Sequence, residues 1–245
     1  MTDAIKILSI GNSFSEDAQA WLLELLPAGS IVANLYMPGQ SLAGHREQLT
    51  YNLADYSYQK RTAAGRTNLG SDIKYGLLDE DWDYVTLQQS SGLSGVINSY
   101  GDDIGYLVDV IKRYRPQAKI CWHMTWAYAR YSEHPDFKNY GNNQLLMQKA
   151  IHQCLERVIQ TDKRIDIILP TGDAIQKARS LVEAEEELTR DGFHLSYLLG
   201  RYIAALSWAQ RLIGELPNWA PAGMTASELL LARKAVRGIL EDENG

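Results

Sequence analysis

Short apolar runs of strand length alternate with longer amphipathic segments along most of the chain. Apolar runs bounded by glycine, proline or polar residues predict strands at 5–10, 30–37, 84–87, 119–124 and 165–169. Helical spacing of apolar residues predicts helices at 16–26, from about 42, and at 104–113, 143–160, 174–187, 198–212 and 227–240. The last helix opens with a Thr225-x-x-Glu228 capping box. This alternation favours a parallel sheet with helices on both faces.

We therefore expect a single α/β domain over residues 1–245, with three α/β/α layers and a mainly parallel five-stranded sheet. The connection rules for such sheets place the C-terminal ends of the strands along one rim. Residues just after the strands can then converge at that rim. Residues 51–68 fit this scheme least well, and we expect them to form a small antiparallel excursion near it.

Composition sets the broad class and excludes several kinds of partner. The chain has 245 residues and is 45% hydrophobic, which is enough for one sizeable core. A formal charge of −6 argues against nucleic-acid binding, because phosphate contacts need clustered lysine and arginine. Cys121 and Cys154 lie in apolar runs and are expected to be small buried side chains. No Cys-x-x-Cys or His-Glu-x-x-His motif occurs, so the sequence predicts no metal site.

Two observations bear on where the protein works. Four residues precede the first predicted strand, which leaves no room for a signal peptide, and no apolar run reaches membrane-spanning length. We therefore expect a cytoplasmic protein without membrane contact, or a secreted one if a leader has been trimmed from the chain. The sequence leaves the oligomeric state open.

The first strand ends in the segment Gly11-Asn12-Ser13-Phe14-Ser15. Gly11 permits a sharp turn, so Ser13 is expected between a strand end and a helix start. At that position its hydroxyl can face the rim, and nearby backbone N–H groups can stabilise developing negative charge. The same segment is equally typical of a helix start at which Ser13 or Ser15 is only the cap.

A second polar segment, Asp191-Gly192-Phe193-His194, precedes a late helix. A serine nucleophile needs a base, and the base needs an orienting acid. The spacing can bring the Asp191 carboxylate to Nδ1 of His194 while Nε2 faces a serine. Taken alone, the segment also fits a turn aspartate followed by a half-exposed histidine.

Together the two segments resemble the first and last signature blocks of the SGNH (GDSL-like) hydrolases, a superfamily named for Ser, Gly, Asn and His in four blocks. The resemblance covers nearly the whole chain and is closest to a bacterial branch with Gly-Asn-Ser-Phe in the first block and Leu-Gln in the third. It implies the flavodoxin-like SGNH fold and a serine esterase that needs no cofactor. It also implies Ser13 as nucleophile, His194 as base and Asp191 as orienting acid.

The two middle blocks of the resemblance are divergent, so the oxyanion hole is less well defined. Gly39 in Met37-Pro38-Gly39-Gln40-Ser41 is the first candidate for the second-block glycine. The third block lacks the usual asparagine, but a glutamine amide offers the same donor. Gln88 is the first choice and Gln89 the second, and the N–H of Ser13 is expected to add a further donor. Polar residues at a strand exit can also simply mark a turn.

The expected substrate is a small-molecule or saccharide ester with a short acyl group, such as an acetylated carbohydrate. His45, at a helix start, and Trp126, after the fourth strand, are candidate substrate-binding residues, although capping and packing explain them equally well. A thioesterase or lysophospholipase with the same three residues is an alternative. A non-catalytic carbohydrate-binding protein on this scaffold is another. No Gly-x-Ser-x-Gly or phosphate-binding glycine motif occurs, which disfavours a standard α/β-hydrolase or a nucleotide-binding protein.

Overall fold

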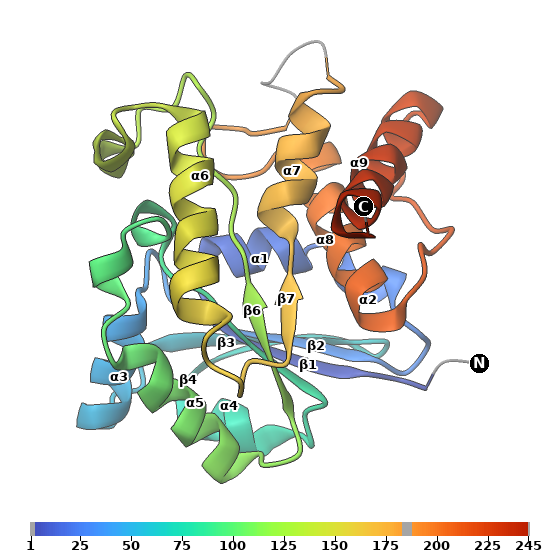
Figure 1. The fold of residues 1–245 in the computed structure, drawn as a ribbon. Coiled ribbons are helices and arrows are strands. Elements are labelled where there is room, and N and C mark those ends of the chain that lie inside the picture. The colour runs from blue at the N-terminus through green and yellow to red at the C-terminus, as the bar shows by residue number, and fades with distance from the viewer. Residues whose placement is uncertain (1–2, 183–187, 245) are drawn as a thin grey trace.

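A seven-stranded sheet forms the centre of the computed structural model, which describes residues 3–182 and 188–244 (Figure 1). Its strand order is β4-β3-β2-β1-β5-β6-β7. The strands are β1 (Lys6–Gly11), β2 (Ile31–Tyr36), β3 (Tyr56–Thr62), β4 (Gly65–Ser71), β5 (Tyr84–Leu87), β6 (Lys119–His123) and β7 (Ile167–Leu169).

The five predicted strands are all present and are mutually parallel, from β2 through β1, β5 and β6 to β7. The prediction of a five-stranded sheet is nevertheless wrong, because β3 and β4 extend the sheet as an antiparallel hairpin. The expected excursion is therefore part of the main sheet. The side chains of Tyr56 and Tyr58 are buried and that of Ser57 between them is partly exposed, so burial alternates along β3 as in a strand with one buried face.

Helices lie on both faces of the sheet, as the alternating pattern predicts. They are α1 (Ser13–Gln19), α2 (Leu22–Leu25), α3 (Leu42–Tyr51), α4 (Ile73–Asp79), α5 (Asp103–Tyr114), α6 (Gln144–Cys154), α7 (Thr171–Arg179), α8 (Leu199–Ile213) and α9 (Ala226–Asn244). A π-helical turn, Leu155–Ile159, extends α6, and 3₁₀ turns occur at Ser91–Leu93, Ile97–Ser99 and Pro135–Tyr140.

Two groups of helices can be told apart by their mutual contacts. α8 packs against α1, α2, α7 and α9, whereas α3, α4 and α5 pack against one another (Figure 1). The expected capping box is confirmed at the start of α9. The N–H of Thr225 donates to Glu228 Oε2 at 2.7 Å, and the N–H of Glu228 donates to Thr225 Oγ1 at 3.2 Å.

Two predicted helices differ from the structure. The segment 16–26 is divided into α1 and α2, and the carbonyls of Gln19 and Ala20 at the break accept hydrogen bonds from Arg61 at 3.0 and 2.8 Å. Carbonyls at a helix end need such partners, and sequence spacing does not reveal a donor on a distant strand. The segment 174–187 is seen as α7, and its residues 183–187 lie outside the described part.

The sequence also predicts two buried cysteines and no apolar run of membrane-spanning length. Cys121 and Cys154 are free and buried, as expected. Across residues 3–182 and 188–244, no helix has the combined length and apolar character that crossing a bilayer requires.

Gly172, in the first turn of α7, sets how closely that helix approaches the end of β6. Its N–H donates to the carbonyl of Met124 at 2.9 Å. A Cβ atom at this position would lie 2.4 Å from the carbonyl oxygen of Thr125, which is backbone and cannot rotate away. The close contact therefore requires glycine.

We expect Gly172→Ala to lower the free energy of unfolding by about 1–3 kcal/mol, because the added methyl group overpacks a rigid contact. Urea unfolding measures the change. Gly70→Ala on β4 is the matched control, since a Cβ there meets nothing within 4 Å. Equal stabilities for the two variants would contradict this account of α7.

Candidate active site

Ser13 lies at the rim formed by the C-terminal ends of the parallel strands. β1 ends at Gly11, Asn12 is extended, and Ser13 is the first residue of α1. The cap of α1 is Asn12, whose Oδ1 accepts the N–H of Phe14 at 2.9 Å. Ser15 is buried and donates its hydroxyl to the carbonyl of Asn12 at 2.7 Å. The capping alternative therefore does not account for Ser13, whose half-buried hydroxyl faces elsewhere.

Ser13, His194 and Asp191 form one hydrogen-bonded series. The distance from Ser13 Oγ to His194 Nε2 is 2.9 Å, and that from His194 Nδ1 to Asp191 Oδ2 is 2.7 Å. Because an ionised carboxylate only accepts hydrogen bonds, Nδ1 carries a hydrogen and donates a hydrogen bond to Asp191. In the tautomer of a neutral imidazole that this bond selects, Nε2 accepts a hydrogen bond from the Ser13 hydroxyl.

Asp191 serves the local turn and the imidazole with different oxygens. Oδ1 accepts the backbone N–H groups of Phe193 and His194 at 3.1 and 2.7 Å, which leaves Oδ2 for Nδ1. Burial alone would raise the pKa of Asp191, but the hydrogen bonds from His194 and Phe193 outweigh it and lower this pKa. The carboxylate therefore stays ionised at neutral pH.

A buried carboxylate, Asp17, joins the helix of Ser13 to the loop of His194. It accepts Arg190 Nη1 at 3.1 Å, Arg201 Nε at 2.7 Å and the backbone N–H of Leu195 at 2.8 Å. Arg190 and Leu195 flank the segment that holds Asp191 and His194. Asp17 thus fixes that segment relative to α1.

Two further hydrogen bonds hold the loop that contains Asp191 and His194. The N–H of Arg190 donates to the carbonyl of His194 at 3.0 Å, so the loop is a tight turn. Trp126 Nε1 donates to the carbonyl of Phe193 at 2.7 Å. Gly192 has φ +85°, and a Cβ there would lie 2.8 Å from the Cα of Ser132. Glycine is therefore required both for its conformation and for its packing.

Gln88 follows β5 and belongs to a chain of hydrogen bonds whose directions are determined. Asn12 Oδ1 already accepts a backbone N–H, so Gln88 Nε2 is the donor in its 2.7 Å contact with that oxygen. Gln88 Oε1 must then accept from His123 Nδ1 at 2.7 Å. Burial lowers the pKa of His123 to about 3, so this histidine is neutral and carries its proton on Nδ1. Gln88 is 1% exposed, and one of its two Nε2 hydrogens has no acceptor among the described residues.

Gln89, the second choice for an oxyanion donor, has a different environment. Its Nε2 donates to the carbonyl and the hydroxyl of Ser99 at 3.0 and 3.1 Å. Its Oε1 accepts the N–H groups of Leu42 and Ser90 at 3.1 and 2.9 Å. Both of its donor hydrogens are therefore engaged in holding loops together.

Gly39 occupies an exposed turn that follows β2. The N–H of Gln40 donates to the carbonyl of Met37 at 3.3 Å, and Gly39 has φ +63° at the position where a type II turn needs glycine. Asn12 Nδ2 donates to the carbonyl of Gln40 at 3.0 Å. The capping residue of α1 thus also ties this turn to the rim.

The structure does not place His45 and Trp126 where they can contact a substrate, because both side chains are fully buried. His45 Nδ1 pairs with the Tyr56 hydroxyl at 2.6 Å, and burial lowers the pKa of His45 to about 3. Trp126 stacks on Phe14 with ring centroids 4.2 Å apart. Trp126 thus supports the loop of His194 from the core.

Comparison with known proteins defines the family. Residues 6–236 match the family described as "Domain of unknown function (DUF4886)". The chain belongs to this family. A DUF4886 family protein from Bacteroides uniformis is 33% identical, with a TM-score of 0.92, and the match covers 99% of this chain and 97% of that one. A comparison with curated proteins finds no match.

More distant structures share the fold of this DUF4886 protein. A protein assigned to the SGNH hydrolases, from Slackia heliotrinireducens, is 21% identical with a TM-score of 0.57, over 86% of this chain and 100% of that one. Axe2, an acetylxylan esterase from Geobacillus stearothermophilus, is 13% identical with a TM-score of 0.54, over 91% and 100%. The DUF4886 chain therefore has the fold of the SGNH hydrolases, as the sequence resemblance implies.

Sequence reasoning missed the residues that support the site of the DUF4886 protein. Asp17 and Arg190 are 173 positions apart, and His123 lies inside an apolar strand. The sequence offers one indication of these supporting residues, namely polar side chains at positions where the apolar pattern predicts burial.

Within the described ranges, no group of three His, Cys, Asp or Glu residues is arranged to hold a metal ion.

We expect Asp17→Ala to lower the free energy of unfolding by about 3–5 kcal/mol, because it leaves two arginines without their buried partner. Asp17→Asn should lower the free energy of unfolding by less than Asp17→Ala, since one acceptor oxygen remains. Glu24→Ala is the matched control: it removes a partly exposed partner of Arg61, and such pairs contribute only about 0–1 kcal/mol. Urea unfolding tests the contrast, and equal losses would refute it.

Proposed function

We propose that this DUF4886 protein is a serine esterase that hydrolyses carboxylic esters through an acyl-enzyme on Ser13. The observation that carries the proposal is the series from Ser13 Oγ through His194 to Asp191 at the strand rim. A hydroxyl paired with a neutral imidazole, itself oriented by a carboxylate, is the arrangement that activates a serine.

In the first step, His194 Nε2 takes the proton of the Ser13 hydroxyl while Oγ forms a bond to the ester carbonyl carbon. The carbonyl π pair moves to oxygen and gives a tetrahedral oxyanion. Collapse of this intermediate breaks the bond to the alcohol portion, which leaves with the proton from His194. Asp191 stabilises the charged imidazole between these transfers and keeps it oriented.

In the second step, water replaces the departed alcohol. His194 accepts a proton from the water as its oxygen attacks the acyl-enzyme, and it then returns that proton to Ser13 Oγ as the acid leaves. The reaction consumes one ester and one water and releases one acid and one alcohol. No cofactor enters the balance.

The proposed oxyanion hole contains the N–H groups of Ser13 and Gly39 and the remaining Nε2 hydrogen of Gln88. Asn12 is bonded to Gln88 and to the turn of Gly39, which supports this grouping. A donor held in place before the reaction stabilises the oxyanion without reorganisation. Gln89 is left out, because its amide hydrogens are already engaged.

The packing around Ser13 favours a short acyl group, such as acetyl. Phe14, which follows Ser13 in the chain, and Trp126 are buried and stacked on each other. They therefore do not line an open channel for a long acyl chain, as a lysophospholipase would need. An acetylated carbohydrate fits this restriction, and an acetylxylan esterase shares the fold.

We expect Ser13→Ala to remove nearly all hydrolysis of p-nitrophenyl acetate, because the nucleophile is lost while the fold is kept. Release of p-nitrophenol measures the rate, and labelling by a fluorophosphonate probe should disappear with it. Ser227→Ala, at an exposed position of α9, is the matched control and should keep both signals. A wild-type rate equal to that of Ser13→Ala would contradict the esterase proposal.

We expect Gln88→Leu to lower kcat by about 10²–10³-fold with little change in KM, because it removes one oxyanion donor. Steady-state kinetics on p-nitrophenyl acetate give both parameters. A thermal unfolding curve is the control for folding, since Asn12 and His123 lose a partner in this variant. A folded variant whose kcat falls less than threefold would remove Gln88 from the oxyanion hole.

A further inference from the structure

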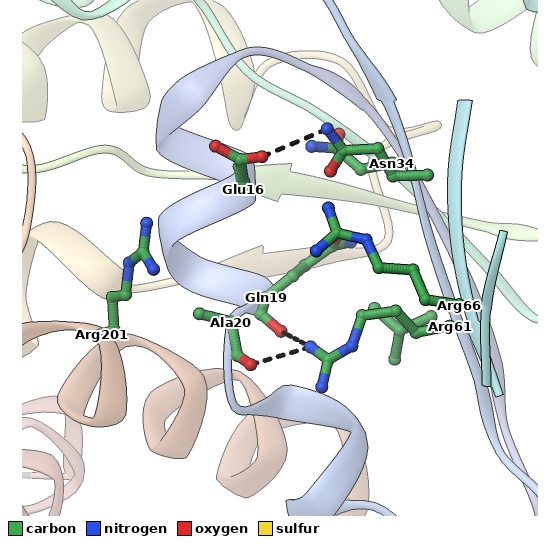
Figure 2. A pocket seen from close by; sticks show the side chains of 9 residues that line it. Glu16, Gln19, Ala20, Asn34, Arg61, Arg66 and Arg201 are labelled. Atoms are coloured by element: carbon green, nitrogen blue, oxygen red, sulfur yellow. Dashed lines mark hydrogen bonds between the residues drawn. The ribbon is translucent and has the colours of Figure 1, made fainter. Parts of the chain in front are cut away.

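A polar groove of about 340 Å³ lies between α1 and the β3–β4 hairpin (Figure 2). We call it the arginine groove and define it by six of the residues that line it: Glu16, Asn34, Gln59, Arg61, Arg66 and Arg201. It lies outside the Ser13–His194–Asp191 series, and the catalytic steps proposed above do not use it.

The groove leads to Ser13 along two elements. Ser13 and Glu16 are three apart on α1, so their side chains are neighbours, with Cβ atoms about 5–6 Å apart. On β2, Asn34 and Tyr36 share one face, and Tyr36 is paired with Gly11 at the end of β1. The groove therefore lies beside the helical turn and the strand end that carry Ser13.

Two of the three groove arginines have partners within the fold. Arg61 donates to the carbonyls that end α1 and to Glu24 Oε1 at 2.7 Å. Arg201 pairs with the buried Asp17 at 2.6 Å. These two guanidinium groups build the walls of the groove.

Arg66 differs from the other two. It lies opposite Arg61 on the outermost strand β4, its side chain is exposed, and Figure 2 shows its guanidinium extended into the groove. Among the described residues, no group forms a hydrogen bond or an ion pair with the guanidinium of Arg66. The guanidinium of Arg66 is thus a positive charge at the groove that can pair with a ligand.

The charges around the groove sum to a positive excess, although the chain as a whole carries −6. Three guanidinium groups line it, those of Arg61, Arg66 and Arg201, against one carboxylate, that of Glu16. Glu16 Oε1 is engaged by Gln59 Nε2 at 3.2 Å, on the β3 side. The environment of Arg66 therefore favours an anionic ligand.

Asn34 provides a second, independent sign of a ligand. Asn34 is 2% exposed and lines the groove, and its Oδ1 lies 3.0 Å from Ser15 Oγ, which shares its one hydrogen between this oxygen and the carbonyl of Asn12. The Nδ2 of Asn34 has no partner within the described part of the chain. A buried donor without a partner is costly, so an acceptor group on a ligand would be stabilised there.

We propose that the arginine groove binds the alcohol portion of the ester substrate, and that this portion is a saccharide bearing a carboxylate, such as a uronic acid. Arg66 pairs with the carboxylate, for which its planar guanidinium is suited. Asn34 Nδ2 donates to a ring or hydroxyl oxygen, and the free oxygen of Glu16 accepts a hydroxyl. The proposal rests on the esterase function, since the groove selects what Ser13 cleaves.

The test compares two substrates that differ only in charge, acetylated glucuronic acid and acetylated glucuronamide, with acetate release as the readout. We expect wild-type protein to favour the acid at least tenfold in kcat/KM, and Arg66→Gln to reduce that ratio to about one. Arg113→Gln, at an exposed position of α5, is the matched control and should keep the ratio. A wild-type ratio near one, or a ratio that survives Arg66→Gln, would overturn the proposal.

A binding measurement separates this proposal from the esterase proposal. Calorimetry with Ser13→Ala protein should detect glucuronate but not glucuronamide, and adding Arg66→Gln should abolish the signal. Glucuronate binding without p-nitrophenyl acetate hydrolysis by wild-type protein would overturn the esterase function alone. Hydrolysis of p-nitrophenyl acetate without glucuronate binding would overturn the groove assignment alone.

Discussion

The buried carboxylate of Asp17 is the interaction on which the rest of the site depends. It accepts from Arg190, Arg201 and the N–H of Leu195, so a single residue joins α1, the loop of His194 and α8. A charge removed from water is tolerated only with such partners, and their directions restrict where each element can lie. The 2.9 Å contact between Ser13 and His194 is a product of this restriction.

A second constraint runs through neutral groups. The N–H of Phe14 fixes the orientation of Asn12, Asn12 fixes that of Gln88, and Gln88 fixes the tautomer of His123. At each contact in this series, one atom can only donate and the other can only accept, so the hydrogen-bond direction at one contact determines the direction at the next. A backbone donor in the first turn of α1 therefore determines how the amide at the end of the neighbouring strand β5 presents its hydrogens.

Local patterns predicted most of the scaffold and failed where distant segments meet. The five parallel strands and the capping box at Thr225 follow from periodicity and short motifs, and the order of the Ser13 and His194 segments was visible for the same reason. The hairpin β3–β4 was underestimated because its polar residues fit a loop equally well. The surroundings of His45, Trp126 and Gln89 depend on partners that no local pattern names, as does the Asp17 cluster.

The brevity of α1 has a consequence for how this chain can vary. Within seven residues it presents Ser13 to the histidine, Asp17 to two arginines and Glu16 to the groove, all from one side of the helix, because positions three and four apart are neighbours. One inserted or deleted residue turns everything beyond it by about 100° and shifts it by about 1.5 Å. Substitutions in α1 can be graded in their effect, whereas a change in its length would misalign Ser13 with the residues that support it.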